Sequence, residues 1–176
     1  MVMNNNHVDI LVDDENWAKV TVISEARCAE VLNMVCDYLR KNQTSAKYDL
    51  QKNNRPIDIT LNLSNAQTIQ QLNAQFRNLD KPTNVLSFAN IDSDDFELVS
   101  QQDERVFLGD IIMAWEVLFD EATQKQIPLE HHFMHLLVHG ILHLLGFDHQ
   151  TDDEAEVMES IEIVVLKQLN IDNPYI

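Results

Sequence analysis

The eleven residues HGILHLLGFDH, at positions 139–149, hold three histidines within a largely apolar stretch. His139 and His143 are four apart, which on a helix puts both on one face, roughly 6 Å apart along the axis. Gly146 fits the position after a helix where φ > 0 is needed, so the chain can turn back there and bring His149 to the same ion. Three imidazoles with an open fourth position are typical of a catalytic zinc site. We therefore predict one Zn²⁺ held by these three residues.

Other histidine pairs compete with this one, because four histidines in a row are spaced four apart: His131, His135, His139 and His143. The third histidine behind a glycine turn favours the pair 139/143. The alternative is a solvated histidine stripe without metal. The neighbouring residues 136–138, 141–142 and 144–145 are all aliphatic, and unpaired imidazoles beside so much apolar surface would be costly.

The spacing HxxxHxxGxxH is also similar to that of metzincin proteases. Their glutamate after the first histidine is replaced by Gly140 here. The sequence thus predicts a zincin-like histidine helix that lacks the peptidase's usual base.

Composition indicates a globular chain with a real core, since 45% of its 176 residues are hydrophobic and glycine and proline are few. We expect one domain over residues 1–176, with residues 1–6 disordered. No apolar run approaches 18 residues, and the start of the chain lacks a secretory signal. Cys28 and Cys36 read as core thiols in a reducing cytoplasm, so we expect a cytoplasmic protein with no membrane partner.

The net charge of −17 argues against nonspecific binding of nucleic acid, DNA included. The charge is uneven, however. Residues 40–81, here called the basic segment, carry seven lysines and arginines against three aspartates, or +4, which leaves −21 for the rest. A polyanion should meet the basic segment; an ordinary mixed surface with acidic loops explains the charges equally well.

Apolar periodicity gives the order β-α-β-α-β-β-α-α-α. Strands are expected near residues 8–12, 57–63, 85–88 and 106–113, the last of them central and buried. Helices are expected over 24–40, after a capping box of Ser64 and Gln67, over 115–122, over the histidines, and after a second capping box of Thr151 and Glu154. Lys81-Pro82 should stop the second helix, and 90–104 should form a mobile acidic loop. The fold class is α+β, with one mixed, roughly four-stranded sheet and about five helices.

Four residues near the histidines have two or more interpretations. Arg77, at the end of the second helix, can clamp a phosphate or bind the last carbonyls of its helix. Asp148 can orient a ligand imidazole or cap the turn. His135 can support a ligand, contact substrate or lie partly exposed, as expected of a histidine one turn away. Met158 fits core packing better than the Met-turn of metzincins.

With LNAQFRNLDKPTNVLSF (72–88), LGDIIM (108–113) and HLLVHGILHLLGFDH (135–149) in view, the chain resembles the YbeY family of bacterial endoribonucleases. The resemblance is strong over about 57–169. Ala89 stands where the family often has proline, and the first 50 residues match no motif.

The resemblance implies a single-strand-specific, metal-dependent endoribonuclease with zinc on His139, His143 and His149 and with Arg77 near the scissile phosphate. It implies roles in ribosomal RNA processing, at the 3′ end of the 16S RNA, and in ribosome quality control, with the small subunit and its proteins as partners. Two other classes compete: a zinc peptidase, suggested by the ligand spacing, and a non-catalytic ribosome-assembly factor with structural zinc.

Overall fold

A computed structural model describes residues 5–44, 46–97 and 103–176. Its centre is a four-stranded sheet of β1 (His7–Val12), β2 (Ile57–Ser64), β4 (Val106–Ala114) and β3 (Val85–Ala89), in that spatial order. β1 and β4 both run parallel to β2, whereas β3 runs antiparallel to β4. The predicted mixed sheet and the interior position of the strand at 106–113 are therefore confirmed.

Five α-helices lie among the described residues, as predicted. They are α1 (Glu25–Asn42), α2 (Ala66–Arg77), α4 (Trp115–Lys125), α5 (Leu129–Leu144) and α6 (Asp152–Gln168). Two short 3₁₀ helices, η1 (Glu15–Lys19) and η2 (Asn90–Asp92), complete the fold. None of these helices is both long and apolar enough to cross a lipid bilayer.

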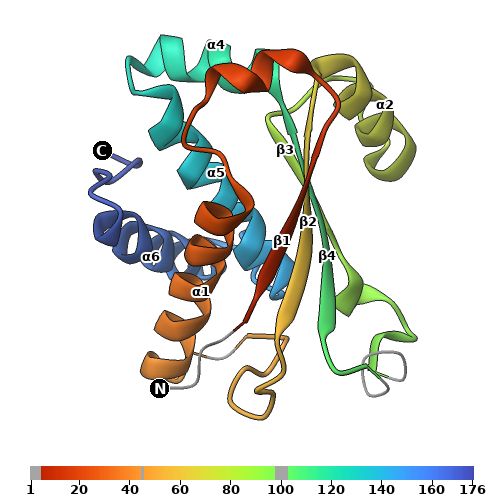
Figure 1. Cartoon of the computed structure of the whole chain (residues 1–176), viewed down its shortest axis with the longest axis vertical. Helices are drawn as coiled ribbons and strands as arrows, with labels where there is room; N and C mark the ends of the chain where they lie inside the picture. The colour runs from red at the N-terminus through yellow and green to blue at the C-terminus, as the bar shows by residue number, and fades with distance from the viewer. Residues whose placement is uncertain (1–4, 45, 98–102) are drawn as a thin grey trace.

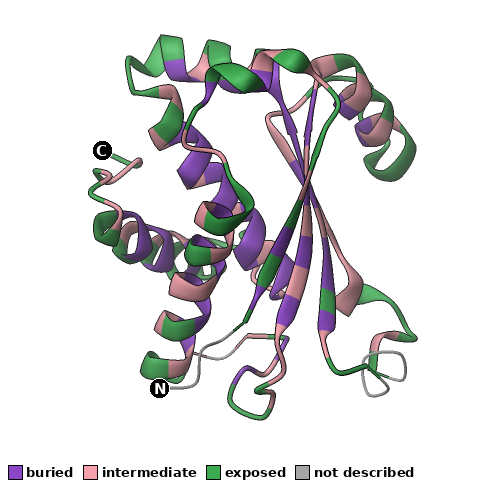
Figure 2. Ribbon diagram, viewed as in Figure 1, coloured by how far each residue is buried: buried purple, intermediate pink, exposed green. Residues whose placement is uncertain are grey.

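Helices cover both faces of the sheet. The side chains of a strand alternate between the two faces, so each strand contributes residues to the packing on both sides. Figure 1 shows α1, α5 and α6 on one side and α2 on the other. On the first side lies the main core, which β4 enters through Ile111 and Met113. Ile112 and Ala114 point the other way and pack with Ile69 of α2. Most residues of α5 are buried (Figure 2). Its apolar side chains belong to the main core, so the histidine helix is held along its length by apolar contacts.

A glycine in β4 makes the pairing with β3 possible. Gly109 has φ +135°, where side chains are strained, and a Cβ there would overlap the carbonyl oxygen of Phe88 on β3. Close by, the β2–β4 register shifts between Asp58 and Ile59. The interruption of the apolar run at Gly109 thus marks a close backbone approach.

Three local predictions were wrong. Asn6 was expected to be disordered, yet it is buried; its Nδ2 donates to Asn33 Oδ1 (2.8 Å) and its Oδ1 accepts from the backbone N–H of Ile57 (2.8 Å). The rest of the expected disordered stretch, except Asn5, lies outside the described residues, as does part of the expected mobile loop, residues 98–102.

The other two errors concern α2. Its N-cap is Asn65 rather than Ser64, because the Asn65 carboxamide accepts from Thr68 N (2.9 Å) and leaves Ser64 as the buried end of β2. The helix also ends at Arg77, four residues before Lys81, because Asn78 adopts φ 57° and reverses the chain.

Two other predictions hold. Thr151 and Glu154 form a capping box at the start of α6. Cys28 and Cys36 are free and buried. Burial raises the pKa of the Cys36 thiol to about 12, although nearby Arg40 opposes the shift, so this thiol stays protonated.

Candidate metal centre

The turn after α5 brings His149 back to the helix. Gly146 has φ +92°, as predicted, and a Cβ there would overlap the side chain of Lys47. Gly146 N donates to His143 O (2.9 Å) and Phe147 N donates to Leu142 O (3.0 Å), which closes the end of the helix. From the other side, Tyr48 N donates to Leu145 O (3.1 Å). The turn that carries the third histidine is therefore fixed by the segment at 47–48.

One group is formed by His139, His143 and His149. Each offers one ring nitrogen, and these three nitrogens lie within 4.8 Å of one another. The two helical histidines are closest, with 3.0 Å between their Nε2 atoms. The His149 ring centre lies 5.3 Å from that of His139 and 5.0 Å from that of His143. In a tetrahedral zinc site, ligand nitrogens are about 3.3–3.4 Å apart, which is close to the 3.0 Å between the two helical histidines.

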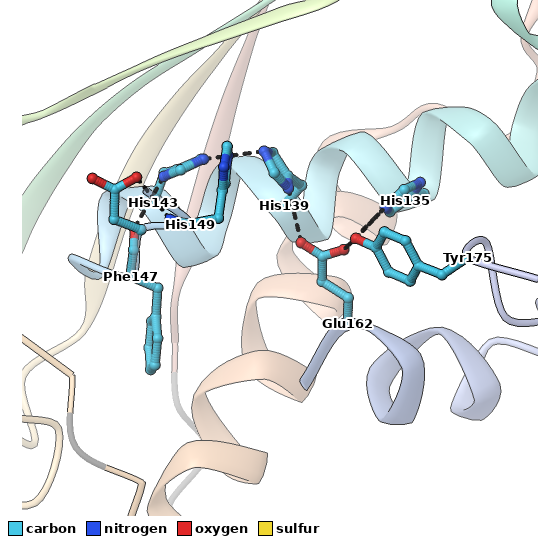
Figure 3. A network of polar contacts seen from close by, with 8 residues as sticks. His135, His139, His143, Phe147, His149, Glu162 and Tyr175 are labelled. Carbon is cyan, nitrogen blue, oxygen red and sulfur yellow. Dashed lines mark hydrogen bonds and ion pairs between the residues drawn. The ribbon is translucent and has the colours of Figure 1, made fainter. Parts of the chain in front are cut away.

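Hydrogen bonds on the far side of each helical imidazole assign its tautomer. His139 Nδ1 lies 2.8 Å from Glu162 Oε1, and His143 Nδ1 lies 3.0 Å from the Phe147 carbonyl oxygen (Figure 3). Both partners are acceptors, so each Nδ1 carries the hydrogen and each Nε2 presents a lone pair. Two lone pairs facing each other at 3.0 Å repel unless a cation lies between them. The donor set therefore fits a divalent metal such as zinc.

His143 is suited to be a metal ligand because it resists protonation. Burial, assisted by the neighbouring His139 and His149, lowers the pKa of its imidazole to about 4. A metal needs the neutral imidazole, so this ligand is ready at neutral pH without first losing a proton.

Glu162 of α6 supports the site and was missed in the sequence. Its side chain is fully buried. Oε1 accepts from His139, while Oε2 lies 3.0 Å from His135 Nε2 and accepts from the Tyr175 hydroxyl. Burial alone would raise the pKa of this carboxyl. The hydrogen bonds from His135, His139 and Tyr175 outweigh the effect of burial and lower the pKa to about 2. Glu162 is therefore a buried carboxylate anion beside a candidate metal ligand.

A signal for Glu162 was present. The apolar stripe of α6 runs 155, 158, 161, 165, 169, and position 162 lies on the same side, four residues after Met158 and three before Val165. An acid on the buried side of a helix needs a partner, and the unexplained His135 was available.

The structure also decides three of the open interpretations. The Asp148 carboxylate accepts from His149 N and from Gln150 Nε2, each at 2.8 Å, which is turn capping. His135 is partly exposed, as expected, with 13% of its side chain accessible, and its Nε2 also contacts Glu162. Met158 is buried in the core, as predicted.

Arg77 makes no contact that links it to the histidine group among the described residues. It is exposed at the last position of α2, the helix on the opposite face of the sheet from α5 (Figure 1). Among the described residues, no hydrogen bond or ion pair joins it to the three histidines. Its neighbour Phe76 packs edge-on against Phe88 of β3, with ring centres 5.2 Å apart. The catalytic role of Arg77 therefore stays a prediction.

Gly140 is explained by packing. It is buried on the side of α5 that faces β4, and a Cβ there would come within 2.9 Å of Ile111 Cδ1. A glutamate cannot occupy this position unless α5 or Ile111 moves. The position that bears the base in the peptidase spacing therefore faces the core in this fold.

The fold and the site together define an α+β protein with a three-histidine centre of the kind that holds a catalytic metal. The chain belongs to the endoribonuclease YbeY family, whose family model matches residues 13–170. It is thus an endoribonuclease-family hydrolase, and RNA is the substrate class that the family name specifies.

Curated relatives show the same likeness. The proteins named endoribonuclease YbeY from Francisella tularensis subspecies novicida (strain U112) and mediasiatica (strain FSC147) are each 40% identical over 99% of this chain and 95% of their own length. A solution structure of a Thermotoga maritima protein is 20% identical with a TM-score of 0.49, over 93% of this chain and 91% of that one.

Proposed function

We propose that this protein is a zinc-dependent endoribonuclease that cleaves single-stranded RNA, acts at the 3′ end of 16S ribosomal RNA and in ribosome quality control, and works in the cytoplasm with the small ribosomal subunit. The observation that carries the metal part is the pair of Nε2 atoms of His139 and His143, which face each other at 3.0 Å with both Nδ1 atoms already bonded.

The protein's own residues would divide the work as follows. His139, His143 and His149 would hold one zinc ion, which supplies Lewis acidity toward a phosphodiester and activates a bound nucleophile. Glu162 and the Phe147 carbonyl would keep two of the ligands in orientation. Arg77 would stabilise negative charge on the phosphoryl oxygens with two charged hydrogen bonds. Water and the RNA 2′-OH both remain candidates for the nucleophile.

The peptidase alternative is disfavoured by Gly140. A zinc peptidase with this ligand spacing takes its base from that position, and here the position packs against Ile111. RNA is the better substrate for a second reason, the excess of positive charge on the basic segment, which includes Arg77.

Charge also favours RNA that is presented by a ribosomal particle. Part of the basic segment is already neutralised: Lys47 Nζ lies 2.5 Å from Asp92 Oδ1, and Lys52 Nζ lies 3.0 Å from Asp49 Oδ2. With a net charge of −17, affinity for free RNA should be low and should fall steeply with salt. A particle that holds both protein and RNA removes this handicap.

The test compares substrates at equal protein concentration with and without chelator: unstructured RNA, the same RNA as a duplex, small-subunit particles carrying unprocessed 16S RNA, and casein. We expect chelator-sensitive cleavage of the single strand at low salt and faster cleavage within particles, with zinc found in the purified protein. Casein cleavage with RNA intact would establish the peptidase instead. Zinc and ribosome binding without cleavage would establish the assembly factor.

A further inference from the structure

The Glu162 carboxylate is fully buried where α6 packs on α5. A buried carboxylate costs several kcal/mol unless it is well paired. Here it has three partners from two separate parts of the chain: His135 and His139 on α5, and Tyr175 in the segment after α6 (Figure 3).

The partners are divided between the two oxygens in a way that leaves His139 a dedicated acceptor. Oε1 accepts from His139 Nδ1 at 2.8 Å. Oε2 is occupied by the Tyr175 hydroxyl and by His135 Nε2 at 3.0 Å, and the latter two atoms lie 3.3 Å apart. Because Oε2 is held at two points, the carboxylate cannot rotate away from His139. Rotation would also break both of those bonds inside the core.

A packing role alone does not account for this arrangement. The surrounding stripe of α6 is apolar, with Met158, Ile161 and Val165 all buried, and a buried ion pair often stabilises a fold no better than well-packed apolar residues. What the carboxylate adds is a fixed acceptor at one nitrogen of the imidazole, which directs the lone pair of the other nitrogen toward His143.

We propose that Glu162, held in place by Tyr175 and His135, is a positioning residue that fixes the Nδ1-protonated tautomer of His139 and so aims its Nε2 at the metal. Tyr175 thereby makes the segment at 173–176 part of the support of the metal centre. This inference rests on the proposed function only in that a metal binds the three histidines.

The first variant is Glu162→Gln, which keeps size and removes charge, and its control is Glu156→Gln, the same change at an exposed position of the same helix. We expect zinc affinity, measured by competition with a chromophoric chelator, to fall about 10–100-fold for Glu162→Gln and to stay unchanged for Glu156→Gln. Tyr175→Phe should lose a few-fold by releasing Oε2.

Two readouts separate positioning from general stability. In the metal-free protein, ¹⁵N chemical shifts of His139 should show a protonated Nδ1 in the parent and a mixture of tautomers in Glu162→Gln. The thermal midpoint of the metal-free Tyr175→Phe variant should fall, because the buried carboxylate loses a partner. Its zinc affinity is therefore measured well below that midpoint, where the protein is fully folded, and should still be lower than that of the parent.

Parental zinc affinity in both Glu162→Gln and Tyr175→Phe would overturn the inference while leaving the proposed function intact. Loss of affinity that only follows loss of folding, with the parental tautomer kept, would also overturn it. Conversely, an RNA-inactive parent that binds zinc in a Glu162-dependent way would refute the proposed function and keep the inference.

Discussion

Replacing Gly140 by alanine tests how closely the histidine helix is fitted to the sheet. The added Cβ would lie 2.9, 3.0 and 3.2 Å from Cδ1, Cγ2 and Cγ1 of Ile111, a fully buried, β-branched residue of β4. Carbon atoms at rest are about 3.5–4.0 Å apart, so α5 or Ile111 must move by roughly 0.5–1 Å.

Two opposing effects set the size of the change. Alanine is about 1 kcal/mol better than glycine within a helix, whereas overpacking a core costs about 1–3 kcal/mol. We therefore expect Gly140→Ala to change the free energy of unfolding by between about zero and 2 kcal/mol, in the destabilising direction. The sign should reverse once the obstacle is removed: in an Ile111→Ala background the same change should stabilise by about 1 kcal/mol.

The assay is urea unfolding of the four proteins of this double-mutant cycle, all in chelator so that metal makes no contribution. The expected coupling between the two positions is about 1–3 kcal/mol. Equal stabilisation by Gly140→Ala in both backgrounds would refute the close contact, and with it the structural reason why this chain lacks the peptidase glutamate.

Further predictions concern the metal, the arginine and pH. Metal analysis should find little zinc in His139→Ala, His143→Ala or His149→Ala but a full complement in His131→Ala; full occupancy in the His149 variant would remove it as a ligand. Arg77→Ala should keep zinc and fold yet lose most RNA cleavage, by several kcal/mol in transition-state stabilisation, with Arg77→Lys recovering part; parental cleavage rates would leave Arg77 as a helix-end residue. Denaturant titrations of the metal-free protein should show stability falling as pH drops from 6.5 toward 4, because the unfolded chain takes up a proton at His143 that the folded protein refuses; a flat profile, or one unchanged in His143→Ala, would contradict this.

The histidine centre was predictable because its information is local. Helical spacing and one glycine turn place His139, His143 and His149 together, and the structure brings the same three nitrogens within 4.8 Å. Capping at Thr151 and the burial of Cys28 and Cys36 follow from equally local patterns.

What the sequence did not reveal depends on distant contacts. The position of Glu162 on the buried side of α6 was a signal, but its pairing with His135 and Tyr175 depends on contacts between separate parts of the chain. Asn6 is ordered by Asn33 and by the backbone of Ile57, 51 residues away. Strand order is of the same kind, since the parallel pairing of β1 with β2 and the antiparallel placement of β3 are set by the packed core rather than by any one segment.

The three candidate ligand histidines fall within eleven residues of chain, and this compactness has a consequence for the unfolded state. Gathering them around an ion closes only a short loop, which costs little entropy, so the denatured chain can bind zinc as well. Any such binding subtracts from the stabilisation that the ion gives to the native state. Zinc should therefore protect the protein from denaturation by less than its native affinity implies. The contribution of Glu162 to zinc affinity would exist only in the folded protein, so this contribution would stabilise the native state alone.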